Sequence, residues 1–252
     1  MVRYHLSIFV FLFLLSSCTQ VGLGPSSSPG GEEQTPLPGD TPTSTQTMVS
    51  GESQLPTKAV EEEISLPPPV LEGKLTLEEV LKARRSIRSF KEKELTLEQV
   101  GQLLWAAQGI TSPDGKRAAP SAGALYPLEV YYFCSQFWGR YDPEEHSLEI
   151  LGREDRREEI AKASLNQSWI AQAPGIFVIV GFVERTAVKY GERAERYVTL
   201  EAGHACQNLL LEAVALGLGG TSVGAFWDDQ IKAILEIEAL PLYVVPVGYP
   251  RD

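Results

Sequence analysis

The chain has 252 residues, 43% of them hydrophobic, and a formal net charge of −11 at pH 7. No basic stripe interrupts this acidic balance, so nucleic acid is excluded as an expected partner. The length leaves room for one domain with its own hydrophobic core behind an N-terminal extension.

The first 18 residues have the organisation of a bacterial lipoprotein signal peptide. Arg3 precedes an apolar run from Leu6 to Leu15, and the tetrapeptide Leu-Ser-Ser-Cys ends at Cys18. The run is shorter than the ~20 apolar residues that a membrane-spanning helix needs. We therefore expect a protein of the bacterial cell envelope, extracytoplasmic and anchored to the membrane by lipidation of Cys18. The alternatives are a secreted form cut nearby, an uncleaved anchor, or a cytoplasmic protein whose first methionine is misassigned.

Residues 19–69 are rich in Pro, Ser, Thr, Gly and Glu and poor in large apolar side chains. Such a segment buries too little surface to offset its ordering entropy, which predicts a disordered tether. The folded domain is expected over residues 70–252. Its cysteines, Cys134 and Cys206, are expected to be buried free thiols, with a disulfide as the alternative. Neither has metal-ligand spacing with a histidine, so no metal site is predicted.

Local signals place most elements of this domain. Capping-box patterns at Thr76 and Thr96 open two helices, the first ending near Arg85 and the second near Gln108. Gly175–Gly181 is apolar at every position and predicts a central strand covered on both faces. Tyr197–Leu216 carries an apolar stripe and is expected to be the longest helix. Further strands are expected over 129–134, 147–151, 221–225 and 242–247, and further helices over 156–165 and 228–235. The prediction is an α+β fold with a central mixed or antiparallel sheet flanked by helices.

Three segments of this domain suit a flavin. An arginine cluster at 84–88 matches a phosphate, and a small-residue loop at 118–127 lets the backbone approach a flat aromatic ring. A late glycine run at 217–224 can wrap the far edge of such a ring. Each segment alone is a weak signal, but the ordered set is a strong one.

These segments belong to a longer series of motifs. The series is Arg84-Arg85-Ser86-Ile87-Arg88, Pro120-Ser121-Ala122-Gly123-Ala124-Leu125-Tyr126-Pro127, Lys189-Tyr190-Gly191-Glu192-Arg193, Glu201-Ala202-Gly203-His204, Gly217-Leu218-Gly219 and Pro246-Val247-Gly248-Tyr249-Pro250. With them the chain resembles the nitroreductase superfamily, and within it the SagB/ThcOx-type dehydrogenases, over Leu77–Pro250. The resemblance implies a nitroreductase-like fold that binds FMN.

The resemblance also implies roles for individual residues. Arg84, Arg85 and Arg88, with Ser86 between them, would hold the FMN phosphate and the polar edge of the ring, and Arg251 would add a second phosphate contact. The alternative for the arginine cluster is a solvated basic helix end, and for Arg251 a frayed tail.

The two glycine-containing segments would enclose the ring. Pro120, Ser121, Ala122 and Gly123 would pass beneath or beside the isoalloxazine, with an ordinary strand-entry turn as the alternative. Gly219 and Gly220 would approach from the other side, with a Schellman-type helix end as the alternative. Tyr126 would line the substrate face or serve in packing.

A Lys-Tyr pair occupies the place where azoline-oxidising members of the subfamily remove a proton. By resemblance Lys189 and Tyr190 would be catalytic, with a solvated loop as the alternative. His204 and Asn208 are expected in structural roles. The resemblance as a whole implies an FMN-dependent oxidoreductase that transfers hydride between flavin and a small organic or heterocyclic substrate, as a homodimer with flavins at its interface. The alternative is a surface lipoprotein that binds flavin or another ligand without turnover.

Overall fold

A computed structural model describes residues 59–251. Within that range the chain forms a seven-stranded sheet of order β1-β4-β3-β2-β5-β7-β6, with neighbouring strands antiparallel. The strands are β1 (Glu62–Ser65), β2 (Leu128–Phe133), β3 (Trp138–Asp142), β4 (Ser147–Gly152), β5 (Gly175–Gly181), β6 (Gly219–Gly220) and β7 (Leu240–Gly248). The predicted α+β fold is confirmed, and its sheet is antiparallel.

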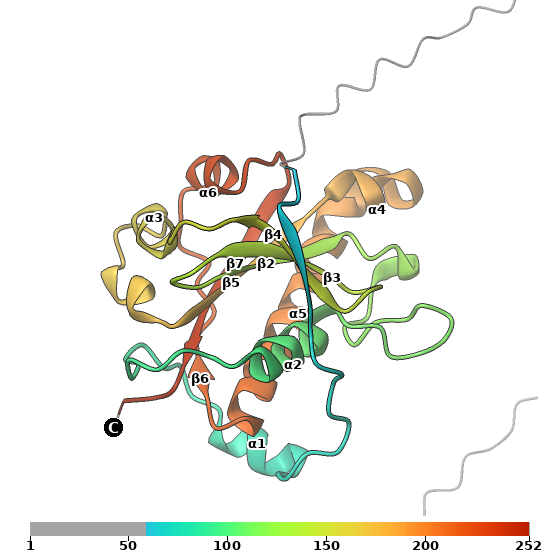
Figure 1. Cartoon of the computed structure of the whole chain (residues 1–252). Helices are drawn as coiled ribbons and strands as arrows, with labels where there is room; N and C mark the ends of the chain where they lie inside the picture. Colours follow the sequence, from blue (N-terminus) through green and yellow to red (C-terminus); the bar gives the residue numbers. More distant parts are fainter. Residues whose placement is uncertain (1–58, 252) are drawn as a thin grey trace, which may run out of the picture. The chain divides into compact units, whose positions relative to one another are not determined.

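Helices cover both faces of this sheet. They are α1 (Leu77–Ala83), α2 (Leu97–Gln108), α3 (Arg157–Ala163), α4 (Val183–Tyr190), α5 (Ala194–Ala215) and α6 (Asp228–Leu235), with short 3-10 turns η1 (Ala122–Ala124), η2 (Ser168–Gln172) and η3 (Gly191–Arg193). In Figure 1, α3 and α6 lie on one side of the strands and α1, α2 and α5 on the other. No helix of residues 59–251 is long and apolar enough to cross a membrane.

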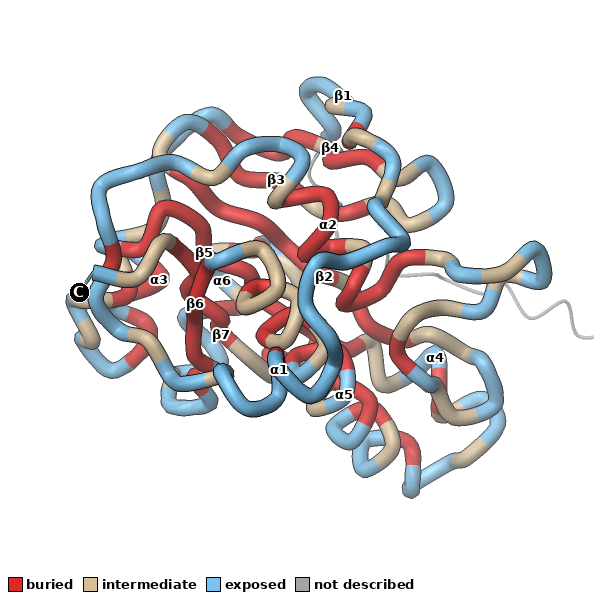
Figure 2. The backbone as a smooth tube through the Cα atoms, turned by 90° about the horizontal axis from the view of Figure 1, so that it is seen from below, coloured by how far each residue is buried: buried red, intermediate tan, exposed pale blue. Residues whose placement is uncertain are grey.

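Strand β5 is the buried middle of this arrangement. Every one of its residues is buried, as its apolar sequence predicts. Phe177 and Ile179 face the cluster formed with α2 and α5, whereas Ile176, Val178 and Val180 face the cluster formed with α3 and α6. Because side chains alternate along a strand, one apolar run fills two cores. Figure 2 shows the buried strands surrounded by exposed loops.

Several local predictions are confirmed in detail. Thr76 and Thr96 each accept a hydrogen bond from the backbone three residues later, completing both capping boxes. Helix α5 ends in a Schellman arrangement, because Leu218 N donates to Ala213 O and Gly217, at φ +72°, donates to Val214 O. Cys134 and Cys206 are buried free thiols, and burial raises the pKa of both.

Other boundaries differ from the sequence predictions. The C-terminal boundary of the tether predicted over residues 19–69 is wrong, because β1 pairs with β4 and Leu66 is buried. The strand expected at 221–225 lies earlier, as β6, because its pairing with β7 ends at Gly220. Within 221–225, Val223 makes an isolated bridge to Val244. Strand β3 and helix α4 were missed. The leader and Cys18 lie outside the described residues.

The position of β1 leads to a test of the domain boundary. A chain that begins at Leu71 loses β1 and Leu66, and burial of one leucine contributes roughly 1.5–3 kcal/mol. We expect its free energy of unfolding, measured by urea denaturation, to fall by about this amount relative to a chain that begins at Glu52. Equal stability of the two chains would contradict a role of β1 in the folded domain and support a domain that begins at residue 70.

Candidate active site

The arginine segment, the glycine strand and the C-terminus form one group in space. Ser86 bridges to Gly220 in parallel, and Ile87 N donates to Gly220 O over 3.0 Å. Arg251 N donates to Ser89 O over 3.0 Å, so the last described residue is bound to the arginine segment and not frayed. We call residues 84–88, Gly219, Gly220 and Arg251 the arginine group.

The arginine side chains of this group suit an anion. Arg85 and Arg88 are exposed and Arg84 is half-buried. Within residues 59–251 no carboxylate makes an ion pair with these three. Arg85 also donates to the carbonyls of Lys82 and Arg84, as the helix-end alternative predicts. Guanidinium groups without carboxylate partners match the oxygens of a phosphate, so the donor set fits FMN.

The glycines of β6 allow close packing of this group. A Cβ added to Gly219 would lie 2.5 Å from Ile87 Cγ1, and one added to Gly220 would lie 2.7 Å from Pro246 O. Both distances are too short for real contacts. The missing side chains therefore bring the arginine segment against β6 and β7, and the Schellman alternative applies to Gly217 instead.

The second group forms around the loop before β2. A Cβ added to Gly123 would lie 3.0 Å from both Lys189 Nζ and Tyr190 Oη, so this loop lies directly against the end of α4. Gly123, Ala124 and Tyr126 all have positive φ, at 64°, 54° and 46°. Left-handed backbone at non-glycine residues costs energy and is concentrated at functional sites. We call residues 120–123 with Lys189 and Tyr190 the loop group.

Tyr126 fixes the shape of this loop. Its backbone N–H donates to Ser121 Oγ over 2.9 Å, and its hydroxyl accepts from Arg117 N over 3.2 Å. The Arg117 guanidinium lies 4.9 Å from the centre of its ring. These contacts favour the packing role for Tyr126 over a place on the substrate face.

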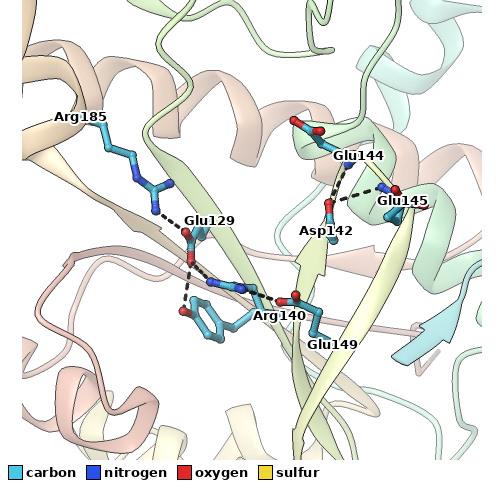
Figure 3. Close-up of polar contacts among 8 residues, drawn as sticks. Glu129, Arg140, Asp142, Glu144, Glu145, Glu149 and Arg185 are labelled. Atoms are coloured by element: carbon cyan, nitrogen blue, oxygen red, sulfur yellow. Dashed lines mark hydrogen bonds and ion pairs between the residues drawn. The ribbon is translucent and has the colours of Figure 1, made fainter. Parts of the chain in front are cut away.

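An ion-pair network holds α4 on the sheet. Glu129 of β2 lies between Arg185 of α4 and Arg140 of β3, and Arg140 also pairs with Glu149 of β4 (Figure 3). The Tyr131 hydroxyl donates to the same Glu129 carboxylate over 3.2 Å. Since α4 ends at Tyr190, this network positions the Lys-Tyr pair. The pair therefore lies at a helix end, where Lys189 is exposed to solvent and Tyr190 is half-buried.

A cavity of about 360 Å³ opens beside this network. Gln108 and Arg117 form part of its wall, together with Glu129, Arg140 and Arg185. Its lining does not include Ser121, Lys189 or Tyr190, so it is separate from the surface of the loop group. Within residues 59–251 no cluster of three or more His, Cys, Asp or Glu residues is arranged to hold a metal.

The two groups lie at different places along α5. The Tyr190 ring of the loop group packs on Tyr197, in the first turns of this helix. The arginine group lies nearer its end, because Gly219 follows the helix and a Cβ added to Gly220 would lie 3.3 Å from Leu210 Cδ2. The helix rises about 20 Å between Tyr197 and Leu210.

Comparison with known proteins agrees with this architecture. The Nitroreductase family model matches residues 81–249. A Methanocaldococcus jannaschii protein whose name assigns it to the nitroreductases is 44% identical over 180 residues, which are 69% of this chain and 91% of that protein. The chain belongs to the nitroreductase family. The Rhizobium leguminosarum bv. trifolii "Trifolitoxin operon protein TfxC" is a more distant relative, 25% identical over 66% of this chain and 53% of its own length.

Solved structures show the same fold. A crystal structure from Ralstonia eutropha JMP134, assigned as a nitroreductase, matches with a TM-score of 0.69 at 28% identity, over 77% of this chain and 91% of that one. The NADPH:FMN oxidoreductase of Vibrio harveyi in complex with NAD⁺ matches with a TM-score of 0.53 at 22% identity, over 70% of this chain and 69% of that one. At that identity the second match shows the fold alone.

Glu201 stands in one of the family motifs of the sequence, Glu201-Ala202-Gly203-His204, but sequence reasoning gave it no role. It lies on α5, is 3% exposed, and its Oε1 has no hydrogen-bond partner within the described chain. Burial raises its pKa to about 7, although a hydrogen bond from Ser121 and the charge of Arg117 act in the opposite direction. Its position between the buried Val198 and Ala205 was an available signal, because a glutamate in an apolar helical stripe is rarely buried without a role. Of the two residues expected in structural roles, His204 is exposed, and Asn208 Nδ2 donates to Ala118 O.

The raised pKa of Glu201 predicts a specific pH dependence of stability. Between the unfolded value of 4.5 and the folded value of about 7, the folded chain binds more protons than the unfolded chain. The free energy of unfolding should therefore fall as pH rises through this window, by on the order of 3 kcal/mol. Urea denaturation at pH 5 and pH 8 should show this loss in wild type and a clearly smaller one in Glu201→Gln, where the raised pKa of Glu212 still contributes. Glu195→Gln, exposed on the same helix, should behave as wild type; an unchanged slope in Glu201→Gln would contradict the assignment.

Proposed function

We propose that this nitroreductase family member is an FMN-dependent oxidoreductase of the SagB-type dehydrogenase kind, which transfers hydride between flavin and a small organic or heterocyclic substrate. The observation that carries the proposal is the position of Gly123, where an added Cβ would lie 3.0 Å from both Lys189 Nζ and Tyr190 Oη. Bound FMN would supply a ring that accepts or gives a hydride. The name of the Vibrio harveyi neighbour, an NADPH:FMN oxidoreductase, supports the choice of cofactor.

The residues of the chain have separate tasks in this proposal. Arg84, Arg88 and Arg251 bind the phosphate as permanently charged donors, and Ser86 and β6 shape the backbone around it. Lys189 Nζ and Tyr190 Oη, next to Gly123, are the groups that hold or move a proton when substrate is oxidised or reduced. The approach of an acid-base pair to the loop favours an enzyme over a binding protein without turnover.

We also propose that each site needs two copies of the chain. The Tyr190 ring packs on Tyr197 and Gly220 lies near Leu210, positions about 20 Å apart along α5, so one chain holds its acid-base pair and its arginine group at separate places. A two-fold homodimer brings the arginine group of one protomer to the loop group of its partner, and forms two equivalent sites. The lipid anchor at Cys18 and the location in the cell envelope remain proposals from sequence.

Flavin binding is tested on the purified full chain. Mixed with FMN and desalted, it should keep a flavin visible spectrum, which dithionite bleaches and a quinone or nitro acceptor restores. Arg84→Ala with Arg88→Ala should lose the flavin, since two charge-assisted contacts of roughly 1.5–3 kcal/mol each are removed. Arg153→Ala, whose arginine pairs with Glu62 far along the chain, is the matched control. A folded wild-type chain that never retains FMN would overturn the proposal, and retention without reoxidation by any acceptor would favour the binding protein.

The composite site is tested by mixing two inactive variants. The first carries Arg84→Ala with Arg88→Ala, and the second carries Lys189→Ala with Tyr190→Phe. After random exchange of subunits, half of all dimers are heterodimers, and each heterodimer has one intact site out of two. About a quarter of wild-type reoxidation should therefore return. A site built within one chain would give no recovery, and native mass spectrometry, which separates the two variants by mass, would confirm that heterodimers formed.

A further inference from the structure

The cavity of about 360 Å³ beside the ion-pair network includes no residue of the arginine group or the loop group in its lining. Its volume lies within the range of small-molecule sites, which is roughly 300–1,000 Å³. Several charged residues of its wall bind one another, because Glu129 lies between Arg140 and Arg185, and Arg140 also pairs with Glu149. These four side chains therefore have their charges balanced within the wall.

Arg117 is a half-buried cation in the same wall that has no such balance. Within residues 59–251 no carboxylate forms an ion pair with it. Its Nη1 donates to Gln108 Oε1 over 3.0 Å, and its guanidinium lies 4.9 Å from the centre of the Tyr126 ring. Burial lowers the pKa of Arg117, because the charged form is partly removed from water. Since arginine is rarely buried without a partner, this position suits an anion in the cavity.

Gln108 gives a second and independent sign of a missing partner. This residue ends α2, lines the cavity and is 1% exposed. Its oxygen accepts the hydrogen bond from Arg117, but its Nε2 is buried and has no hydrogen-bond partner in the described part of the chain. Buried polar groups nearly always have a partner, and a missing one indicates a water or a ligand. An oxygen bound beside Arg117 would be an acceptor for this amide.

The turn between β3 and β4 brings charges of the opposite sign to the same cavity. Asp142 Oδ1 accepts from the backbone N–H groups of Glu144 and Glu145 over 2.8 and 3.4 Å, which fixes the turn (Figure 3). The side chains of Glu144 and Glu145 are exposed, and no described cation forms an ion pair with them. These carboxylates attract an ammonium group and repel a doubly charged anion such as phosphate.

We propose that this cavity binds a small zwitterion of the amino-acid type, whose carboxylate lies on Arg117 and whose ammonium group lies on Glu144 and Glu145. The planar guanidinium matches the two oxygens of a carboxylate. An ammonium group has three N–H donors for the acidic turn. Gln108 is a positioning residue, because it holds the guanidinium that the ligand meets.

The test uses isothermal titration calorimetry on the purified full chain at neutral pH, without flavin. Three zwitterions with increasingly separated charges serve as probes: glycine, γ-aminobutyrate and ε-aminocaproate. At least one should bind saturably, with a dissociation constant of about 1 mM or below. It should bind roughly tenfold more tightly than the carboxylate and the amine of the same chain length, each of which lacks one charged contact.

Two variants assign the two ends of the ligand. Arg117→Gln should weaken binding of the best probe roughly tenfold, since a charge-assisted contact is lost. Glu144→Gln with Glu145→Gln should reduce the zwitterion to the affinity of its matched carboxylate. This double variant changes only exposed side chains, so it keeps the test decisive if Arg117→Gln does not fold. Arg153→Gln, an arginine that pairs with Glu62 outside the cavity, is the control and should bind as wild type.

Three results would overturn the inference. They are no saturable binding of any probe by the folded wild-type chain, a matched carboxylate or amine that binds as tightly as its zwitterion, and an unchanged affinity in either folded variant. Because flavin is absent from every measurement, these results leave the proposed FMN site unaffected. Failure of the chain to retain FMN would likewise leave this cavity to be judged by calorimetry alone.

Discussion

The packing of α5 on the sheet is the interaction on which both groups of the candidate site depend. Its buried face carries Ala202, Ala205, Leu209 and Ala213, and the small side chains let the helix approach the strands closely. The start of α5 follows the Lys-Tyr pair, and its end leads through the Gly217 turn into β6. A single helix therefore links the Lys-Tyr pair to the arginine group.

Two glutamates near this helix, Glu129 and Glu201, have different polar partners. Glu129 is flanked by two arginines and a tyrosine hydroxyl, so its burial beside β2 is balanced and α4 is fixed in position. Glu201 has no such cation in direct contact and keeps one oxygen without a partner. A buried carboxyl in that situation is more stable protonated, which is the physical reason for its raised pKa. The two glutamates show why burial alone does not decide the charge of a side chain.

The proposed homodimer would combine groups that one chain holds at separate places along α5. Two-fold symmetry would join the arginine group of one protomer to the loop group of its partner without any further element. Family membership and fold follow from the comparisons, whereas the shared site remains a proposal.

Local patterns in the sequence determined much of this protein. The capping boxes at Thr76 and Thr96, the apolar run of β5 and the stripe of α5 all depend on neighbours a few residues away, so they were predictable. Tertiary structure decided what depends on distant partners. Strand β1 is polar in sequence and forms because β4 offers a free edge. Helix α4 is held on the sheet by the Arg185–Glu129 ion pair, and Glu201 is buried only in the folded chain, because burial depends on the elements packed against α5 and not on a sequence window.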